Sequence, residues 1–178
     1  MKSALIVVDM LNEYDHEDAQ TLVDNVRAAL PAMQGLVERA ADEETPIIYV
    51  NDNYGDWSAG RPEIVERAIA GRARDLVEPI APPEGTWFIS KARHSIFYET
   101  QLEYLLREQE IDRVVLIGQV TEQCILYSAL DAYVRHFGLA VPCDAVAGIH
   151  ADLADAALRM MERNMRADVA RAGDCTLS

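Results

Sequence analysis

The sequence lacks a CxxC pair and any histidine-rich cluster. Its three cysteines, Cys124, Cys143 and Cys175, are an odd number and are widely spaced. A disulfide framework needs paired cysteines, and a structural zinc site needs closely spaced thiolate and imidazole ligands. The sequence therefore indicates neither, and at least one thiol is expected to be free.

Long apolar runs are also missing. No stretch approaches the ~20 apolar residues that a membrane-spanning helix needs. No basic leader with an apolar stretch and a cleavage site precedes the first strand candidate, which begins at Ala4. We therefore expect a cytoplasmic protein without a membrane partner.

Positive charge is scarce. The chain has 16 Lys and Arg against 30 Asp and Glu, a formal net charge of -14. Nucleic acids and anionic lipids are bound mainly through Lys and Arg, so this balance argues against nucleic acid as a partner. The acidity itself is explained by solubility alone.

Internal repeats, low-complexity tracts and linkers are absent as well. The 178 residues, half of them hydrophobic, are enough for one well-formed core and too few for two ordinary domains. We expect one domain over residues 1–178.

Strand-like and helix-like segments alternate along the chain. Residues 4–8 form a continuous branched apolar run that ends at Asp9, as in a strand buried on both faces. The alternation predicts an α/β fold with three α-β-α layers around a doubly wound, mostly parallel six-stranded sheet. The other expected strands are 46–50, 87–90, 113–118, 139–142 and 167–170, and the expected helices are 22–40, 99–108, 122–137 and 152–166. Pro31 predicts a kink or break in the first helix.

Three polar or reactive residues follow strand ends. Asp9 comes after the first strand, Lys91 after the third and Cys124 shortly after the fourth. In a parallel sheet these ends lie at one edge, where ligands bind. Each residue alone is a weak signal, since loop aspartates, solvated lysines and buried cysteines are common.

The segment before Cys124 is more informative. Thr121 is a suitable N-cap, and an apolar spacing from Ile125 to Ala129 begins at once, so Cys124 is expected in the first turn of a helix. The positive end of the helix dipole and the Lys91 ammonium would lower the thiol pKa, and Glu122 would oppose this.

A thiolate at this position has the partners that acyl transfer requires. The amides of Val120 and Cys124 are candidates for an oxyanion hole, and Asp9 is a candidate to take the thiol proton and return it to the leaving amine. The residues predict attack by Cys124 on a carbonyl carbon of a small amide-like molecule.

Three blocks of the sequence, ALIVVDMLNEY, FISKARHSIFYET and GQVTEQCILYSALDAY, occur in a familiar order. Together they resemble the isochorismatase-like cysteine hydrolases over nearly the whole chain. The resemblance implies a Rossmann-like fold, a triad of Asp9, Lys91 and Cys124, and a cis peptide bond between Gln119 and Val120. It also implies a homodimer or homotetramer.

The sequence departs from the metal-binding members of that family. Nicotinamidase-like members hold a divalent metal through an Asp, a His two residues later and a further His. Here Asp52 is kept, Tyr54 stands at the first His position, and no histidine lies between His16 and His94. Because catalytic zinc ordinarily takes three protein ligands, we expect no catalytic metal and no other cofactor.

Aromatic residues of the same loops are candidates for the substrate pocket. The candidates are Tyr14, Trp57, His94, Phe97 and Tyr127. Core or interface packing explains Phe97 and Tyr127 equally well, and His94 is also explained as an ordinary loop histidine.

Three functions remain open. The first is a metal-independent cysteine hydrolase that cleaves an amide or ureido C–N bond through a Cys124 thioester. The second is an isochorismatase-type vinyl ether hydrolase with Asp9 as the acid, and the third is a catalytically silent binding protein. The presence of Cys124 favours the first, because vinyl ether cleavage needs no sulfur nucleophile. Redox sensing is weaker still, since no resolving cysteine lies nearby in the sequence.

Overall fold

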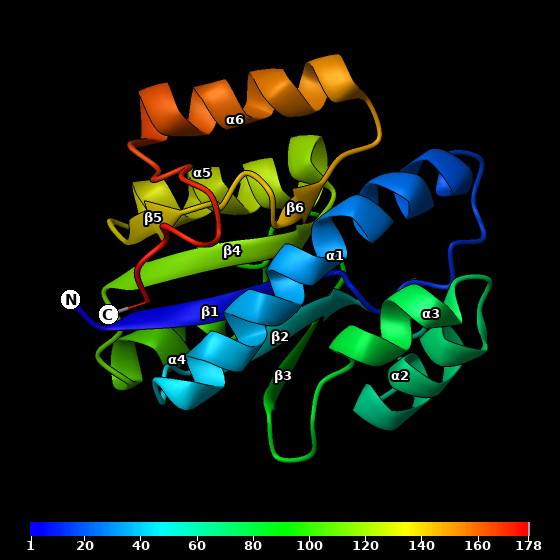
Figure 1. Ribbon diagram of the computed structural model, residues 1–178. Coiled ribbons are helices and arrows are strands. Elements are labelled where there is room, and N and C mark those ends of the chain that lie inside the picture. The colour runs from blue at the N-terminus through cyan, green and yellow to red at the C-terminus, as the bar shows by residue number, and fades with distance from the viewer. Residues whose placement is uncertain (178) are drawn as a thin grey trace.

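A computed structural model describes residues 1–177 of the chain. Within these residues six parallel strands form one sheet in the order β3-β2-β1-β4-β5, with β6 beside the end of β4. The strands are β1 (Ser3–Val8), β2 (Ile47–Asp52), β3 (Trp87–Lys91), β4 (Arg113–Gln119), β5 (Gly138–Ala140) and β6 (Val146–Ala147). The predicted doubly wound α/β fold is confirmed (Figure 1).

Strand β1 lies at the centre of the sheet and all six of its residues are buried. Side chains alternate between the two faces of a strand. Leu5 and Val7 accordingly pack into one core, and Ala4, Ile6 and Val8 into the other. A sheet covered on both faces explains why this segment is apolar throughout.

The helices cover the two faces unequally. Helices α1 (Ala19–Asp42), α2 (Arg61–Ala70) and α3 (Arg74–Val77), with the 3₁₀ turn η1 (Glu78–Ile80), pack on one face. Helices α4 (Leu102–Glu108), α5 (Leu126–Val134) and α6 (Ala151–Met165) pack on the other. In Figure 1, α1 crosses the near face of the sheet, and α4 and α5 lie behind it. These are the three layers that the sequence predicts.

Helix α1 continues through Pro31, so the expected break was wrong. Pro31 is exposed, and its missing N–H therefore lies on the solvent side. Buried residues on both sides of it, among them Val26, Leu30 and Met33, anchor the helix to the sheet. Tertiary packing thus overrides the local cost of the proline.

The sixth strand is not the predicted segment 167–170. That segment runs beside β5 and makes one isolated parallel bridge, between Ala140 and Asp168. The sixth strand is β6, where Val146 pairs with Gly118. A strand of two residues is too short to produce a recognisable apolar pattern.

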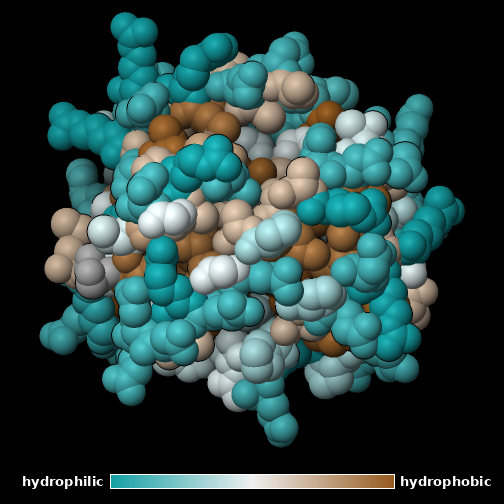
Figure 2. Space-filling view, viewed as in Figure 1, coloured by the Kyte–Doolittle hydropathy of each residue, from teal (hydrophilic) through white to brown (hydrophobic). Residues whose placement is uncertain are grey.

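Hydrophilic side chains dominate the molecular face seen in Figure 2, with apolar residues in small patches between them. This surface agrees with the excess of acidic residues in the sequence. In the part of the chain that the structure describes, no helix is both long and apolar enough to cross a membrane.

Candidate active site

The candidate site lies where the strand order reverses, between β1 and β4. Gly118 has a φ of 116°, and a Cβ atom there would overlap the carbonyl oxygen of Val8. A glycine is therefore needed for the ends of β1 and β4 to approach each other. This is the position in a doubly wound sheet at which ligands bind.

Lys91, the last residue of β3, is at the centre of the site. Its Nζ lies 2.8 Å from Asp9 Oδ2, 3.5 Å from Asp52 Oδ2 and 3.7 Å from Cys124 Sγ. It also donates to the Arg93 carbonyl oxygen at 3.0 Å, and its side chain is fully buried. Burial is the largest single effect and lowers the pKa of Lys91, but Asp9, Cys124 and Asp52 together outweigh it, and the net pKa is raised.

Asp9 is held rigidly beside Lys91. It has a φ of 53°, its Oδ1 accepts the backbone N–H of Asp52 at 2.8 Å, and its carbonyl accepts from Gln119 Nε2 at 2.7 Å. Burial raises the pKa of the Asp9 carboxyl, and the Lys91 ammonium offsets only part of that effect. A carboxylate with a raised pKa is a better proton acceptor than an ordinary aspartate.

Cys124 lies in the π turn η2 (Thr121–Ile125), which precedes α5. The N-cap position is Val120, and no side chain caps the turn, so the expected capping role of Thr121 was wrong. A π turn is wider than an α turn, and such turns often occur at functional sites. Local apolar spacing does not distinguish the two.

The thiol pKa also differs from the sequence-based expectation. Burial and the negative charge of Asp9 raise the pKa of Cys124, while Lys91 and the backbone N–H of Val120 lower it by less. The resting thiol is therefore protonated. The prediction was wrong because it counted the helix and Lys91 but not the burial of the sulfur beside Asp9.

Val120 has the position expected of an oxyanion donor. The Gln119–Val120 peptide bond is cis, as the resemblance implied. The Val120 N–H faces the Cys124 sulfur, and within residues 1–177 it donates to no backbone or side-chain oxygen. The role of the Val120 and Cys124 amides stays a prediction.

Three residues outside the proposed triad hold the backbone of the site, in a role that the sequence analysis did not assign to them. Asn51 accepts from Leu11 N at 2.9 Å and donates to its carbonyl at 3.0 Å, which ties the loop after β1 to β2. Gln119 Oε1 lies 3.3 Å from the hydroxyl of Tyr14. Buried polar residues in otherwise apolar strands were the available signal.

The third is Glu122, whose side chain binds the backbone before α6. Its Oε1 accepts the N–H groups of Ile149 and His150 at 2.9 and 2.8 Å, at the start of α6. Its Oε2 is buried without a hydrogen-bond partner. Glu122 thus links η2 to α6, a contact that the sequence does not reveal because the residues are far apart.

The sulfur opens into a cavity of about 320 Å³. His94 lines it, with Nδ1 3.6 Å from Cys124 Sγ and its ring centroid 5.5 Å from that of Tyr127. Asn12, His16, Asp18 and Tyr54 also line it. The volume suits a small molecule.

The other aromatic candidates lie elsewhere. Tyr14 is fully buried, and burial raises its pKa to about 12. Phe97 stacks on Phe137 in the core at 5.9 Å, and Trp57 is 81% exposed in a surface loop. Tyr14, Trp57, Phe97 and Tyr127 are not lining residues of the cavity. Their substrate-binding roles stay predictions.

The residues at the position of the family's metal site form other hydrogen bonds in this protein. Asp52 Oδ1 accepts from Tyr54 N at 2.7 Å, and the Tyr54 hydroxyl donates to the Leu11 carbonyl at 2.9 Å. No three His, Cys, Asp or Glu side chains within residues 1–177 are grouped as metal ligands. These donors do not fit the family's metal, and metal independence remains a prediction.

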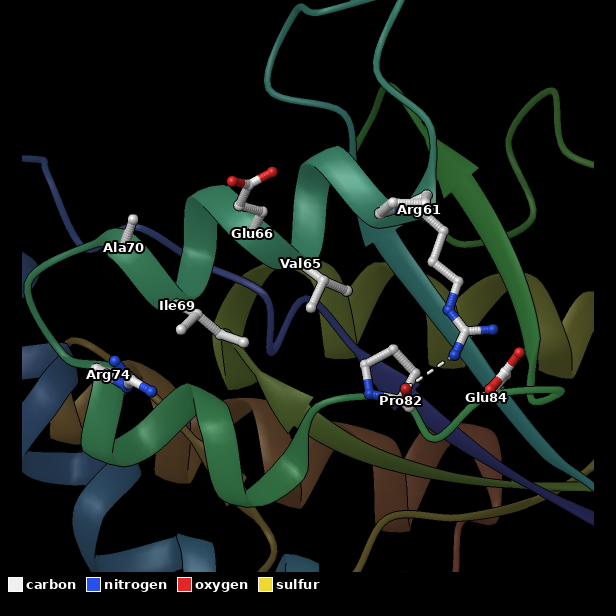
Figure 3. A pocket seen from close by; sticks show the side chains of 9 residues that line it. Arg61, Val65, Glu66, Ile69, Ala70, Arg74, Pro82 and Glu84 are labelled. Atoms are coloured by element: carbon white, nitrogen blue, oxygen red, sulfur yellow. Dashed lines mark hydrogen bonds between the residues drawn. The ribbon is translucent and has the colours of Figure 1, made fainter.

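A larger depression of about 790 Å³ lies between α2 and the segment around Pro82 (Figure 3). Val65 and Ile69 point into it, and Arg61 donates to the Pro82 carbonyl at 2.8 Å. Among residues 1–177, no cysteine, serine, threonine or histidine lines it. It therefore offers no thiol, hydroxyl or imidazole for acyl transfer, and the smaller cavity at Cys124 is the candidate active site.

The comparison with known families decides the identification. A model of the isochorismatase domain matches residues 3–174. The chain belongs to the isochorismatase family. It is thus an isochorismatase-family hydrolase, as the three sequence blocks predict.

Named relatives of this isochorismatase-family chain agree. It is 35% identical to the uncharacterized isochorismatase family protein YaaI of Bacillus subtilis, over 93% of this chain and 92% of that protein. It is 31% identical to maleamate amidohydrolase of Pseudomonas putida, over 85% and 75%. Its fold matches N-carbamoylsarcosine amidase from Thermoplasma acidophilum with a TM-score of 0.75 and 31% identity, over 98% and 99%.

Proposed function

We propose that this protein is a metal-independent cysteine hydrolase that cleaves an amide or ureido C–N bond of a small molecule through a thioester on Cys124. The observation that carries the proposal is the buried contact of Lys91 Nζ with both Asp9 Oδ2 and Cys124 Sγ, at 2.8 and 3.7 Å. Two relatives are named for hydrolysis of such bonds, maleamate amidohydrolase and N-carbamoylsarcosine amidase.

The first half-reaction forms the thioester. Asp9 takes the thiol proton, and the sulfur attacks the carbonyl carbon of the substrate. The N–H groups of Val120 and Cys124 bind the developing oxyanion, which needs donors already in place. Asp9 then gives its proton to the leaving nitrogen, and the C–N bond breaks to release the amine or ammonia.

The second half-reaction hydrolyses the thioester and restores the free enzyme. Asp9, again a carboxylate, takes a proton from water, and the hydroxide attacks the thioester carbonyl. The C–S bond breaks, Asp9 returns the proton to the sulfur, and the acid leaves. Lys91 stays charged throughout and stabilises first the thiolate and then the Asp9 carboxylate.

Vinyl ether hydrolysis is the second candidate, because the raised pKa of Asp9 also suits a carboxylic acid that donates a proton. In that reaction Cys124 would be a bystander. Turnover of isochorismate by a Cys124→Ala variant would select this candidate over the first.

Helix α5 supports the proposal of a homodimer or homotetramer. Tyr127, Leu130 and Val134 expose 45%, 47% and 54% of their surface on one helix, and exposed apolar groups of this kind are common at interfaces. Light scattering should give a mass of twice or four times 19.8 kDa for the wild-type protein. The Leu130→Asp variant should have a lower mass than the wild-type assembly. A monomeric wild-type protein would contradict the proposal.

The experiment that tests the proposed reaction is an ammonia-release screen over small primary amides and ureido compounds, with and without a chelator. We expect turnover that a chelator leaves unchanged. Excess iodoacetamide should abolish it by labelling Cys124, whereas a Cys143→Ala variant, which removes a thiol of intermediate burial, should keep full activity. Activity that survives labelling of Cys124, or needs an added metal, would contradict the proposal.

A further inference from the structure

The wall of the Cys124 cavity has an excess of negative charge. Three aspartates line it, Asp9, Asp18 and Asp52. Among the residues that the structure describes, no lysine or arginine lines it. Arginine is the usual partner of a substrate carboxylate, because its guanidinium binds both oxygens at once.

The surface beside the cavity also carries acidic residues. A neighbouring depression of about 330 Å³ shares Asn12, His16 and Tyr54 with it and adds Glu13 and Asp15. All of these except Tyr54, which follows β2, belong to the loop between β1 and α1.

Three cations near the cavity are already paired, and the exposed Arg93 does not line it. Lys91 is fully buried and bound to Asp9, so Lys91, Asp9 and Asp52 together carry one net negative charge. Arg72 pairs with Asp15, and Arg67 lies 4.0 Å from Glu13, outside the cavity. None of these cations is free to receive a carboxylate.

Asp18 adds a second uncompensated charge. It occupies the N-cap position of α1 but forms no side-chain capping hydrogen bond, and no salt bridge to it occurs within residues 1–177. The helix terminus offsets only part of a unit charge.

We infer that the substrate is a small amide whose group beside the scissile carbonyl is uncharged or cationic, and that the cavity disfavours amides bearing a carboxylate. This rests on the proposed function for the reaction, but the charge selection is a property of the cavity itself. Neutral polar groups on the wall suit such a substrate, notably the side-chain amides of Asn12 and Gln123.

Two alkylating reagents of nearly equal size test the charge selection directly. Iodoacetamide is neutral and iodoacetate is anionic, and both alkylate a thiolate with loss of iodide. Their rates at Cys124 are measured by peptide mass spectrometry at pH 8, above the range in which imidazoles ordinarily titrate. Each rate is divided by that of 2-mercaptoethanol with the same reagent.

After this correction we expect Cys124 to prefer iodoacetamide by about tenfold or more, as like charges at close range predict. Asp18→Asn should reduce the preference severalfold. Glu38→Gln, which removes an exposed carboxylate of α1, is the matched control and should leave it unchanged. A preference for iodoacetate, no preference, or no labelling by either reagent would overturn the inference.

A substrate pair separates this inference from the proposed function. Succinamide and succinamate share a scissile amide and differ by one negative charge. We expect kcat/KM about 100-fold higher for succinamide, on the same electrostatic grounds. Equal turnover of both overturns the charge selection alone, whereas the expected labelling ratio without hydrolysis of any amide overturns the proposed function alone.

Discussion

The ammonium of Lys91 lies 2.8 Å from the carboxylate of Asp9, and both groups are buried. They come from the ends of two strands separated in the sheet by β2. Breaking one partner of a buried ion pair leaves an uncompensated charge, which typically costs about 3–5 kcal/mol. This pair therefore determines both the stability of the site and the ionisation of its thiol.

Lys91→Met should slow alkylation of Cys124, because it removes the positive charge that lowers the thiol pKa against burial. We expect the pH at which the iodoacetamide rate reaches half its maximum to rise. Arg93→Met is the matched control, since it removes a neighbouring exposed cation whose backbone carbonyl still binds Lys91. An unchanged pH profile in Lys91→Met would contradict the role given to this ammonium.

The acid limb of the pH–rate profile, where activity falls at low pH, should reflect protonation of the Asp9 carboxylate. Only the carboxylate form accepts the thiol proton, so kcat/KM should fall about tenfold per pH unit below its pKa. Burial raises that pKa, and the limb should therefore lie above the ordinary aspartate value of about 3.9. A pH–rate profile, limited to the range in which circular dichroism shows the native fold, measures it. A profile flat down to about pH 4 would contradict the assignment of Asp9 as base.

Gly118→Ala should destabilise the fold, because its φ of 116° is strained for alanine and the new methyl group would meet the Val8 carbonyl. We expect a loss above ~2 kcal/mol in urea unfolding. Gly35→Ala is the control. Gly35 lies on the exposed face of α1, where nothing lies within 4 Å of the added atom. It should gain about 0.5–1 kcal/mol through helix propensity, and equal effects at the two sites would contradict this account.

Glu122→Gln should loosen the attachment of η2 to α6, since its carboxylate accepts two backbone N–H groups. Loss of charge-assisted hydrogen bonds predicts a decrease of about 1–3 kcal/mol in the free energy of unfolding. Glu162→Gln, an exposed change on α6, should have almost no effect. If the two variants have the same free energy of unfolding, the carboxylate of Glu122 does not stabilise the attachment of η2 to α6.

The sequence contains enough information for the central strands and for the proximity of the three residues of the proposed triad. Residues 4–8 and 113–118 are buried on both faces, and this leaves a continuous apolar pattern that ends at the site. Asp9, Lys91 and Cys124 could be placed together because parallel strands bring their ends to one edge.

Other features depend on contacts between distant segments, which local patterns do not encode. Helices α2 and α3 went unpredicted, and β6 pairs through only two residues. The thiol pKa depends on burial of Cys124 beside Asp9, which follows from the packed site and not from the helix alone. Of the candidates for the substrate pocket, His94 lines the cavity, whereas Phe97 stacks in the core and Trp57 faces solvent, which local patterns do not reveal either.

The central claim is that Cys124 forms the covalent bond to substrate, and the intact mass of the protein tests it most directly. The protein is quenched in acid during turnover of the best amide from the screen. We predict a mass increase equal to the acyl group on Cys124 in the wild-type protein, and neither the adduct nor turnover in a folded Cys124→Ala variant. Undiminished turnover by Cys124→Ala would contradict the account.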